Sequence, residues 1–228
     1  MLYIISDYLE PVSNFTYLVS VLLYGQNKPG NLRYKVLSGY YFIGAVLMIK
    51  ASLLNRANIP NIGIYDFMFL LTSLCIGFFF YLTLLSQKKK AVIIGICCID
   101  AVYYILNDIV FKGSALFDST GYVILSVGIV VMIFMFMHQI LTNVSDESLW
   151  FNFEFWFVSS LLIYFLGSFV IFLSFNYLTR RILPDELYVP ENRDLLTALW
   201  GVHNVLLFLS SLLTLGSVLW ISFRKKLL

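Results

Sequence analysis

Long apolar runs alternate with short polar segments along the whole chain. Seven runs hold about 18 or more residues with few charges, the length that an α-helix needs to cross a bilayer. The segments between them carry Pro, Gly and Asn, which end helices and form turns. The pattern predicts an all-α, polytopic integral membrane helix bundle, with residues 1–228 forming one transmembrane domain. The seven spans are expected at approximately residues 2–24, 36–55, 64–86, 91–111, 120–141, 152–177 and 195–222.

The first run is the weakest of the seven predicted spans. Asp7, Glu10 and Pro11 fall within it, and a charge in hydrocarbon costs about 3 kcal/mol or more. Proline also removes a backbone hydrogen-bond donor and can loosen the helix locally. The alternative is a first segment that lies partly in the membrane interface. In that case the other six spans keep their orientation and only the N-terminus changes side.

Basic residues on alternate sides of the spans predict the orientation, because cytoplasmic loops carry an excess of lysine and arginine. One side receives nine of them: Lys28, Arg33, Lys35, Lys88, Lys89, Lys90, Arg224, Lys225 and Lys226. The other side receives six: Lys50, Arg56, Lys112, Arg180, Arg181 and Arg193. We therefore expect the N-terminus outside and the C-terminus in the cytoplasm. The first run lacks the basic region and small-residue cleavage site of a signal peptide, so we expect it to be retained.

Composition narrows the classes of function. The 228 residues are 60% hydrophobic and only 12% charged, so the seven spans consume most of the chain and leave no room for a soluble catalytic domain. The net charge of +2 is too small to favour nucleic acid as a partner. The lipid bilayer is the expected environment, and any function must lie in the membrane or in the short loops.

Polar residues recur at helical spacing within three of the predicted spans. Because residues three and four apart share one face of a helix, each set forms a polar stripe. Three stripes suggest a shared polar interior. They are Asp7, Glu10 and Asn14 in the first span, Asp100, Tyr104, Asn107 and Asp108 in the fourth, and Trp200, His203, Asn204, Ser211 and Thr214 in the seventh.

The predicted orientation gathers polar groups toward the outer side of the membrane. They are Asp7, Glu10, Lys50, Asp66, Asp108, His203 and Asn204. Together they are typical of a polar pocket that opens outward. Lys50 is the only basic residue inside a span, and an acidic partner such as Asp7, Glu10 or Asp108 would lower its cost in lipid. Alternatively, Lys50 extends its long side chain to the headgroups, and Asp66 and Asp108 mark helix ends.

Asp100 and His203 are the leading candidates for binding a ligand or a proton. Asp100 lies near the middle of its span, where a short carboxylate cannot reach the headgroups, so it is expected to face a polar core. His203 is the residue type whose charge changes most easily near neutral pH, although a lone histidine in a helix is also often a packing residue. Asp7, Glu10, Lys50, Asn107, Asp108 and Asn204 are the secondary candidates.

Several chemistries lack the residues that they need. The two histidines, His138 and His203, are expected near opposite membrane faces, so they cannot build a bis-histidine haem site or a three-histidine zinc site. The seventh span contains no lysine for a retinal Schiff base. Serine-hydrolase, zinc-protease and P-loop motifs are absent. We expect no metal and no cofactor, and an intramembrane enzyme is the least favoured class.

A sensor or partner subunit is the favoured function, and a small-solute or proton-coupled transporter is the alternative. By its seven-span layout and the W-x-x-H-N segment with Trp200, His203 and Asn204, the chain resembles small bacterial membrane sensor modules that accompany histidine kinases. The resemblance implies an inner-membrane location and a membrane or cytoplasmic signalling partner. It assigns no role to any single residue.

Overall fold

The computed structural model describes residues 2–26, 28, 30–57, 59–110, 117–142, 149–181 and 190–224. This part of the chain is all-α, as predicted, and contains seven α-helices with a π-helical turn η1 after α4 and a short 3-10 turn η2 before α6. Each α-helix overlaps one of the seven apolar runs. The helices are α1 (Leu2–Gly25), α2 (Leu32–Arg56), α3 (Ile62–Thr83), α4 (Gln87–Tyr104), α5 (Ser119–Thr142), α6 (Phe153–Arg181) and α7 (Pro190–Arg224); the turns are η1 (Ile105–Val110) and η2 (Leu149–Phe151).

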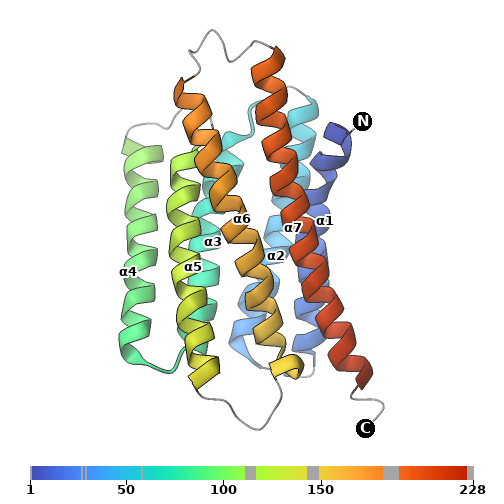
Figure 1. The fold of residues 1–228 in the computed structure, drawn as a ribbon, viewed down its shortest axis with the longest axis vertical. Coiled ribbons are helices and arrows are strands. Elements are labelled where there is room, and N and C mark those ends of the chain that lie inside the picture. Colours follow the sequence, from blue (N-terminus) through green and yellow to red (C-terminus); the bar gives the residue numbers. More distant parts are fainter. Residues whose placement is uncertain are drawn as a thin grey trace.

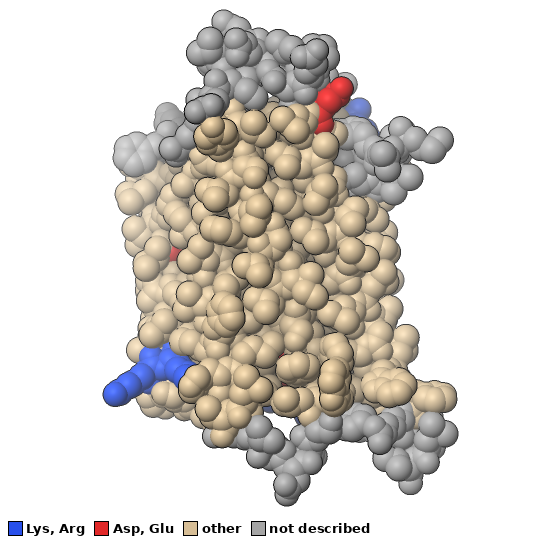
Figure 2. Space-filling view, in the orientation of Figure 1, with Lys and Arg blue, Asp and Glu red and all other residues tan. Residues whose placement is uncertain are grey.

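Six of the helices, α2 to α7, are long and apolar enough to cross a membrane. Their outward faces expose large apolar side chains such as Phe42, Ile99, Phe134 and Leu209, which in water would form a costly apolar surface. On the face drawn in Figure 2, charged side chains lie near the two ends, with a basic group at the lower left and acidic and basic atoms at the upper right, and the band between the ends is almost wholly uncharged. These features are consistent with a multi-pass membrane protein.

The helices run alternately up and down, and the two termini lie at opposite ends of the bundle (Figure 1). Helix α1 packs extensively against α2 and α7, and further contacts join α2 to α3, α3 to α5, α5 to α6 and α6 to α7. These six helices therefore form a closed ring. Helix α4 stands outside it at the edge of the bundle, where it packs chiefly against α3 and α5.

Local sequence explains where several helices begin and end. Asn31 caps α2 with its side-chain oxygen, which accepts a hydrogen bond from the Arg33 N–H at 3.1 Å. Asn152 does the same for α6, where its Oδ1 accepts from the N–H groups of Glu154 and Phe155 at 2.8 and 3.2 Å. Gly30 precedes the first of these caps with a φ of 88°, a conformation that glycine adopts without strain.

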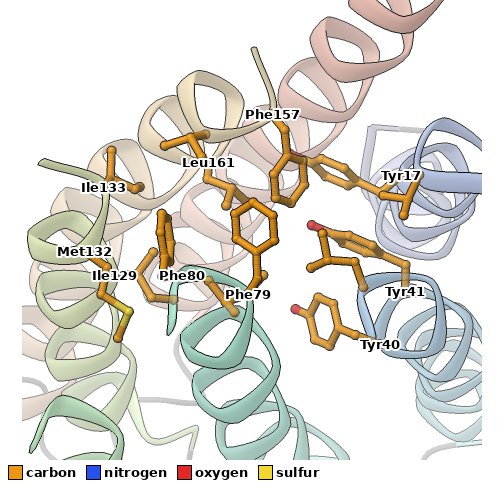
Figure 3. Packing of buried hydrophobic residues seen from close by; sticks show 14 of the residues in the cluster. Tyr17, Tyr40, Tyr41, Phe79, Phe80, Ile129, Met132, Ile133, Phe157 and Leu161 are labelled. Carbon is orange, nitrogen blue, oxygen red and sulfur yellow. The ribbon is translucent and has the colours of Figure 1, made fainter. Parts of the chain in front are cut away.

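An aromatic layer fills the middle of the ring (Figure 3). The rings of Tyr17 and Tyr41 stack with centroids 4.6 Å apart, and the Phe157 ring stands edge-on to both at 6.2 and 6.4 Å. Phe79 meets Phe157 edge-on at 5.2 Å. Four helices, α1, α2, α3 and α6, contribute these buried side chains, so the layer joins both sides of the helix ring.

Small residues set the closest helix approaches. A Cβ added at Gly44 would lie 2.7 Å from Asn14 Oδ1, and one added at Gly128 would lie 2.6 Å from a methyl group of Ile96. Gly77 is similarly close to the sulfur of Cys97. Such contacts are typical of membrane bundles, where close backbone approach supplies van der Waals packing. Cys97 therefore packs α4 against α3.

Candidate functional site

A cavity of about 70 Å³ lies inside the ring, in the half of the bundle that contains the beginning of α1. An enclosed water needs at least roughly 10–15 Å³ by the same measure, so the cavity has room for several waters or for one ligand of a few heavy atoms. Six helices line it and α4 contributes nothing. The lining side chains are Glu10, Asn14 and Tyr17 of α1, Tyr40, Tyr41 and Met48 of α2, Tyr65, Met68, Thr72 and Ile76 of α3, Tyr122 and Leu125 of α5, Leu161, Tyr164 and Phe165 of α6, and Trp200, His203 and Leu207 of α7.

Glu10 brings a carboxylate to the cavity. Its side chain is buried, with 6% exposure, and its Oε2 accepts a hydrogen bond from the Tyr65 hydroxyl at 3.1 Å. One turn further along α1, Asn14 donates from Nδ2 to the Glu10 carbonyl at 3.0 Å, which leaves the Asn14 side-chain oxygen close to Gly44. The two polar residues thus lie on the inward face of α1, as the predicted stripe requires.

His203 lies on the α7 side of the same cavity. Its Nδ1 is 3.0 Å from Ser168 Oγ and its Nε2 is 3.3 Å from the Tyr164 hydroxyl. A neutral imidazole has one donor and one acceptor, and a hydroxyl can serve either. Both nitrogens are therefore satisfied without a charge on the ring. The ring also packs against Trp200 and Phe172, with centroids 5.2 and 4.9 Å away.

Three aromatic residues form a wall of the cavity, which we call the aromatic wall: Tyr65, Tyr122 and Trp200. Tyr65 and Trp200 meet edge-on with centroids 5.4 Å apart. All three rings pack on Phe117, which stands behind them at centroid distances of 6.2 Å from Tyr65 and 4.9 Å from each of the others. The Tyr122 hydroxyl donates to the Tyr65 carbonyl at 2.7 Å, so the wall is held in place by packing and by a hydrogen bond.

Two of the predicted polar stripes meet at this cavity. Glu10 and Asn14 from α1 face it together with Trp200 and His203 from α7. Asn204 is buried beside His203 but does not line the cavity. The side chains of Asp7 and Asp108, also candidates, lie outside the described part of the structure.

Asp100 lies elsewhere, in the contact between α4 and α3. Its side chain is buried, with 1% exposure, and its Oδ2 accepts a hydrogen bond from Ser73 Oγ at 2.6 Å. No described residue offers a hydrogen bond to its other oxygen. Asp100 thus faces a polar contact between two helices, and the structure does not bring it to His203.

The remaining candidates are also away from the cavity. Lys50 is exposed near the end of α2 and does not line the cavity. Asn107 Nδ2 donates to Asp118 Oδ2 at 3.3 Å, which places it at the junction of η1 and α5. Asp100 and Asn107 of the fourth-span stripe therefore do not line the cavity that the other two stripes share.

Sequence reasoning missed most of the cavity lining. Six tyrosines face the cavity, yet only Glu10, Asn14, Trp200 and His203 of its lining were singled out from the sequence. Tyrosine is also common at membrane–water interfaces, so the position of a tyrosine along the chain does not reveal whether its side chain points into the bundle. The signal available was the count of 15 tyrosines in 228 residues.

A second polar cluster, at the opposite end of the bundle, was missed as well. Arg33 Nη1 is 2.9 Å from Glu154 Oε1, and the Tyr34 hydroxyl donates to the same oxygen at 2.7 Å. This cluster joins the start of α2 to the start of α6.

Comparison with known proteins gave no match to a family model, a curated protein or a solved structure. Among the described residues no three His, Cys, Asp or Glu side chains come together as a metal site. A function is therefore inferred from the residues that line the cavity.

Proposed function

We propose that this chain is a seven-span membrane protein that binds a small ligand in the cavity and works as a sensor or partner subunit in signalling. The observation that carries the proposal is the convergence of Glu10 and His203 on one buried cavity walled by aromatic rings. Burying a carboxylate is costly unless it gains partners, and a protein that only had to pack its helices would be more stable without it.

Closure of the cavity on its inner side favours binding over conduction. Tyr17 and Tyr41 line the cavity and also belong to the stacked aromatic layer in the middle of the ring. Phe79 and Phe157 continue that layer across the bundle. A solute that entered the cavity would meet fully buried, interlocked rings, whereas a channel needs a continuous polar path.

Helix α7 offers a route from the cavity to the C-terminal end. The helix from His203 to Arg224 is about 30 Å long at ~1.5 Å per residue. Near the cavity, Tyr17 donates to Ser210 Oγ at 2.9 Å and lies 3.3 Å from Ser160 Oγ, which in turn is 2.7 Å from Thr214 Oγ1. A ligand that shifts α1 would alter these contacts and bias the position of α7.

The seven-span topology belongs to the proposal. Helix α1 packs between α2 and α7 over much of its length, and its 24 residues correspond to about 36 Å of helix. We place its N-terminus outside and the C-terminus in the cytoplasm, because the side that receives the C-terminal segment carries more lysine and arginine than the other side. The location proposed is a bacterial inner membrane, and the partner is a membrane or cytoplasmic signalling protein such as a histidine kinase.

Copurification in mild detergent through a C-terminal tag tests the sensor assignment. A stoichiometric signalling protein identified by mass spectrometry would support it. The matched measurement is reconstitution of the purified chain alone into liposomes loaded with candidate solutes. Solute flux in the absence of any partner would refute the sensor assignment in favour of a transporter.

A further inference from the structure

We propose that a groove between the end of α1 and the beginning of α2 binds the headgroup of an anionic phospholipid. The groove has a volume of about 330 Å³ and lies at the end of the bundle opposite the cavity (Figure 1). It is separate from the proposed ligand site. The inference depends on the membrane location of the chain and is independent of the sensor role.

Two lysine side chains give the groove its charge. Lys28 precedes α2 and Lys35 lies in its first turn, and both are exposed and line the groove. The Lys28 ammonium stands 5.1 Å from the centroid of the Tyr24 ring. None of the described lining residues is acidic, and the two residues of this connection outside the described part, Asn27 and Pro29, are of uncharged types. An anion in the groove would therefore meet two counter-charges.

The charge balance of the whole end favours the same sign of ligand. Nine lysine and arginine residues fall in the sequence segments at this end, against three acidic residues, Asp146, Glu147 and Glu154. The balance is basic with the residues outside the described part included, because the sequence supplies all of them. In the proposed orientation this end faces the cytoplasmic leaflet, whose anionic lipids attract lysine and arginine next to the membrane.

Hydrogen bonds hold the connection that carries Lys28. Its N–H donates to the Gly25 carbonyl at 2.9 Å, and its carbonyl accepts from the Asn31 N–H at 3.3 Å. Gly30 completes the turn with its φ of 88°. Lys28 is thus placed beside the beginning of α2, where the helix dipole adds partial positive charge. A site that is already ordered loses less entropy on binding than a flexible one.

Apolar side chains on the other side of the groove favour a lipid over a free anion. Val21 and Leu22 of α1 line it, and Leu22 is 46% exposed. On α2, Lys35, Gly39 and Phe42 are exposed and share one face. A small residue and then a phenyl ring therefore follow the lysine toward the middle of the membrane. An acyl chain along this face adds apolar contact while the phosphate meets the lysines, and a free phosphate would gain nothing from it.

The test uses the full chain purified in mild detergent. Native mass spectrometry measures bound lipid, and thermal unfolding measures the stabilisation. Phosphatidylglycerol is the anionic probe, phosphatidylcholine with the same acyl chains is the zwitterionic control, and inorganic phosphate is the free anion. We expect phosphatidylglycerol to bind saturably and to raise the unfolding temperature more than either control.

The double variant Lys28→Gln with Lys35→Gln removes both charges of the groove. Its apparent affinity for phosphatidylglycerol should fall at least about tenfold. Lys88→Gln with Lys90→Gln is the matched control, because it removes two charges at the beginning of α4, at the same end of the bundle. Lys90 also stands 5.1 Å from the centroid of a tyrosine ring, that of Tyr81. This control should bind like the wild type.

Each outcome supports or overturns the proposal. Saturable binding of phosphatidylglycerol that is weakened by the groove variant and kept by the α4 variant supports it. Equal weakening in both variants would show a diffuse attraction to the basic end and overturn it. Equal binding of phosphatidylcholine, equal stabilisation by inorganic phosphate, or no bound lipid also overturns it. The copurified partner and the liposome flux test the sensor role separately, so either proposal can fail while the other survives.

Discussion

The hydrogen bond between Ser73 and Asp100 makes a quantitative prediction about how α4 is held on the ring. Ser73→Ala removes the hydroxyl that lies 2.6 Å from Asp100 Oδ2. Because no described residue offers a hydrogen bond to the other carboxyl oxygen, the substitution leaves the whole buried group without its described partner. Asp100→Asn removes the charge and keeps an oxygen that can still accept from Ser73.

The expected magnitude follows from the burial of this pair. Leaving a buried polar group unsatisfied costs about 1–3 kcal/mol, and interhelical hydrogen bonds in membrane bundles contribute ~0.6 kcal/mol on average, with a maximum near 1.7. We expect Ser73→Ala to lower the free energy of unfolding by about 1–2 kcal/mol. In the Asp100→Asn background the same substitution should cost less than ~1 kcal/mol, because a bond to a neutral amide is weaker than one to a carboxylate. Asp100→Asn alone should leave stability equal or raised.

Reversible unfolding of the four proteins of this cycle in mixed detergent micelles, followed by circular dichroism, measures the coupling directly. Ser126→Ala is the control, since Ser126 is equally buried but donates to the Tyr122 carbonyl of its own helix at 2.7 Å. A cost of Ser73→Ala no larger than that of Ser126→Ala, with the same value in both Asp100 backgrounds, would refute the reasoning.

Three further substitutions test other contacts of the bundle. Gly44→Ala should lower the free energy of unfolding by about 1–3 kcal/mol in the same detergent unfolding assay, because its Cβ would lie 2.7 Å from Asn14 Oδ1. Gly39→Ala is the control and should be neutral or stabilising, since no atom lies within 4 Å of its Cβ. Equal effects of the two substitutions would contradict the close approach at Gly44. Glu154→Gln should cost no more than about 1 kcal/mol, since it weakens the partly buried contact with Arg33 but keeps an oxygen that can accept from both Arg33 and Tyr34. A larger loss by the same measurement would show that the charge of Glu154 contributes more than its hydrogen bonds. Tyr17→Phe should cost roughly 0.5–1.5 kcal/mol by loss of the Ser210 bond; wild-type stability would argue against the hydrogen bond.

The sequence by itself determined the helices. Apolar runs long enough for a bilayer, broken by Pro, Gly and Asn, predicted all seven, most of them within about four residues of their observed ends. The exceptions are α4, which gives way to the π-helical turn η1 after Tyr104, and α7, which begins five residues before the predicted start. Helical spacing also placed Glu10 and Asn14 on one face of α1 and Trp200 and His203 on one face of α7. These are local properties, since the rise and turn of an α-helix fix which residues share a face.

Only the tertiary structure decided which faces meet. The stripe containing Asp100 has the same spacing as the stripes of α1 and α7, but α4 packs outside the ring, so Asp100 lies against Ser73 while Glu10 and His203 border the cavity. Periodicity gives the face of a helix and carries no information on its neighbours. The tyrosines of the cavity were beyond sequence reasoning for the same reason: in a membrane protein both the lipid-facing and the inward faces are apolar, and helix packing alone selects between them.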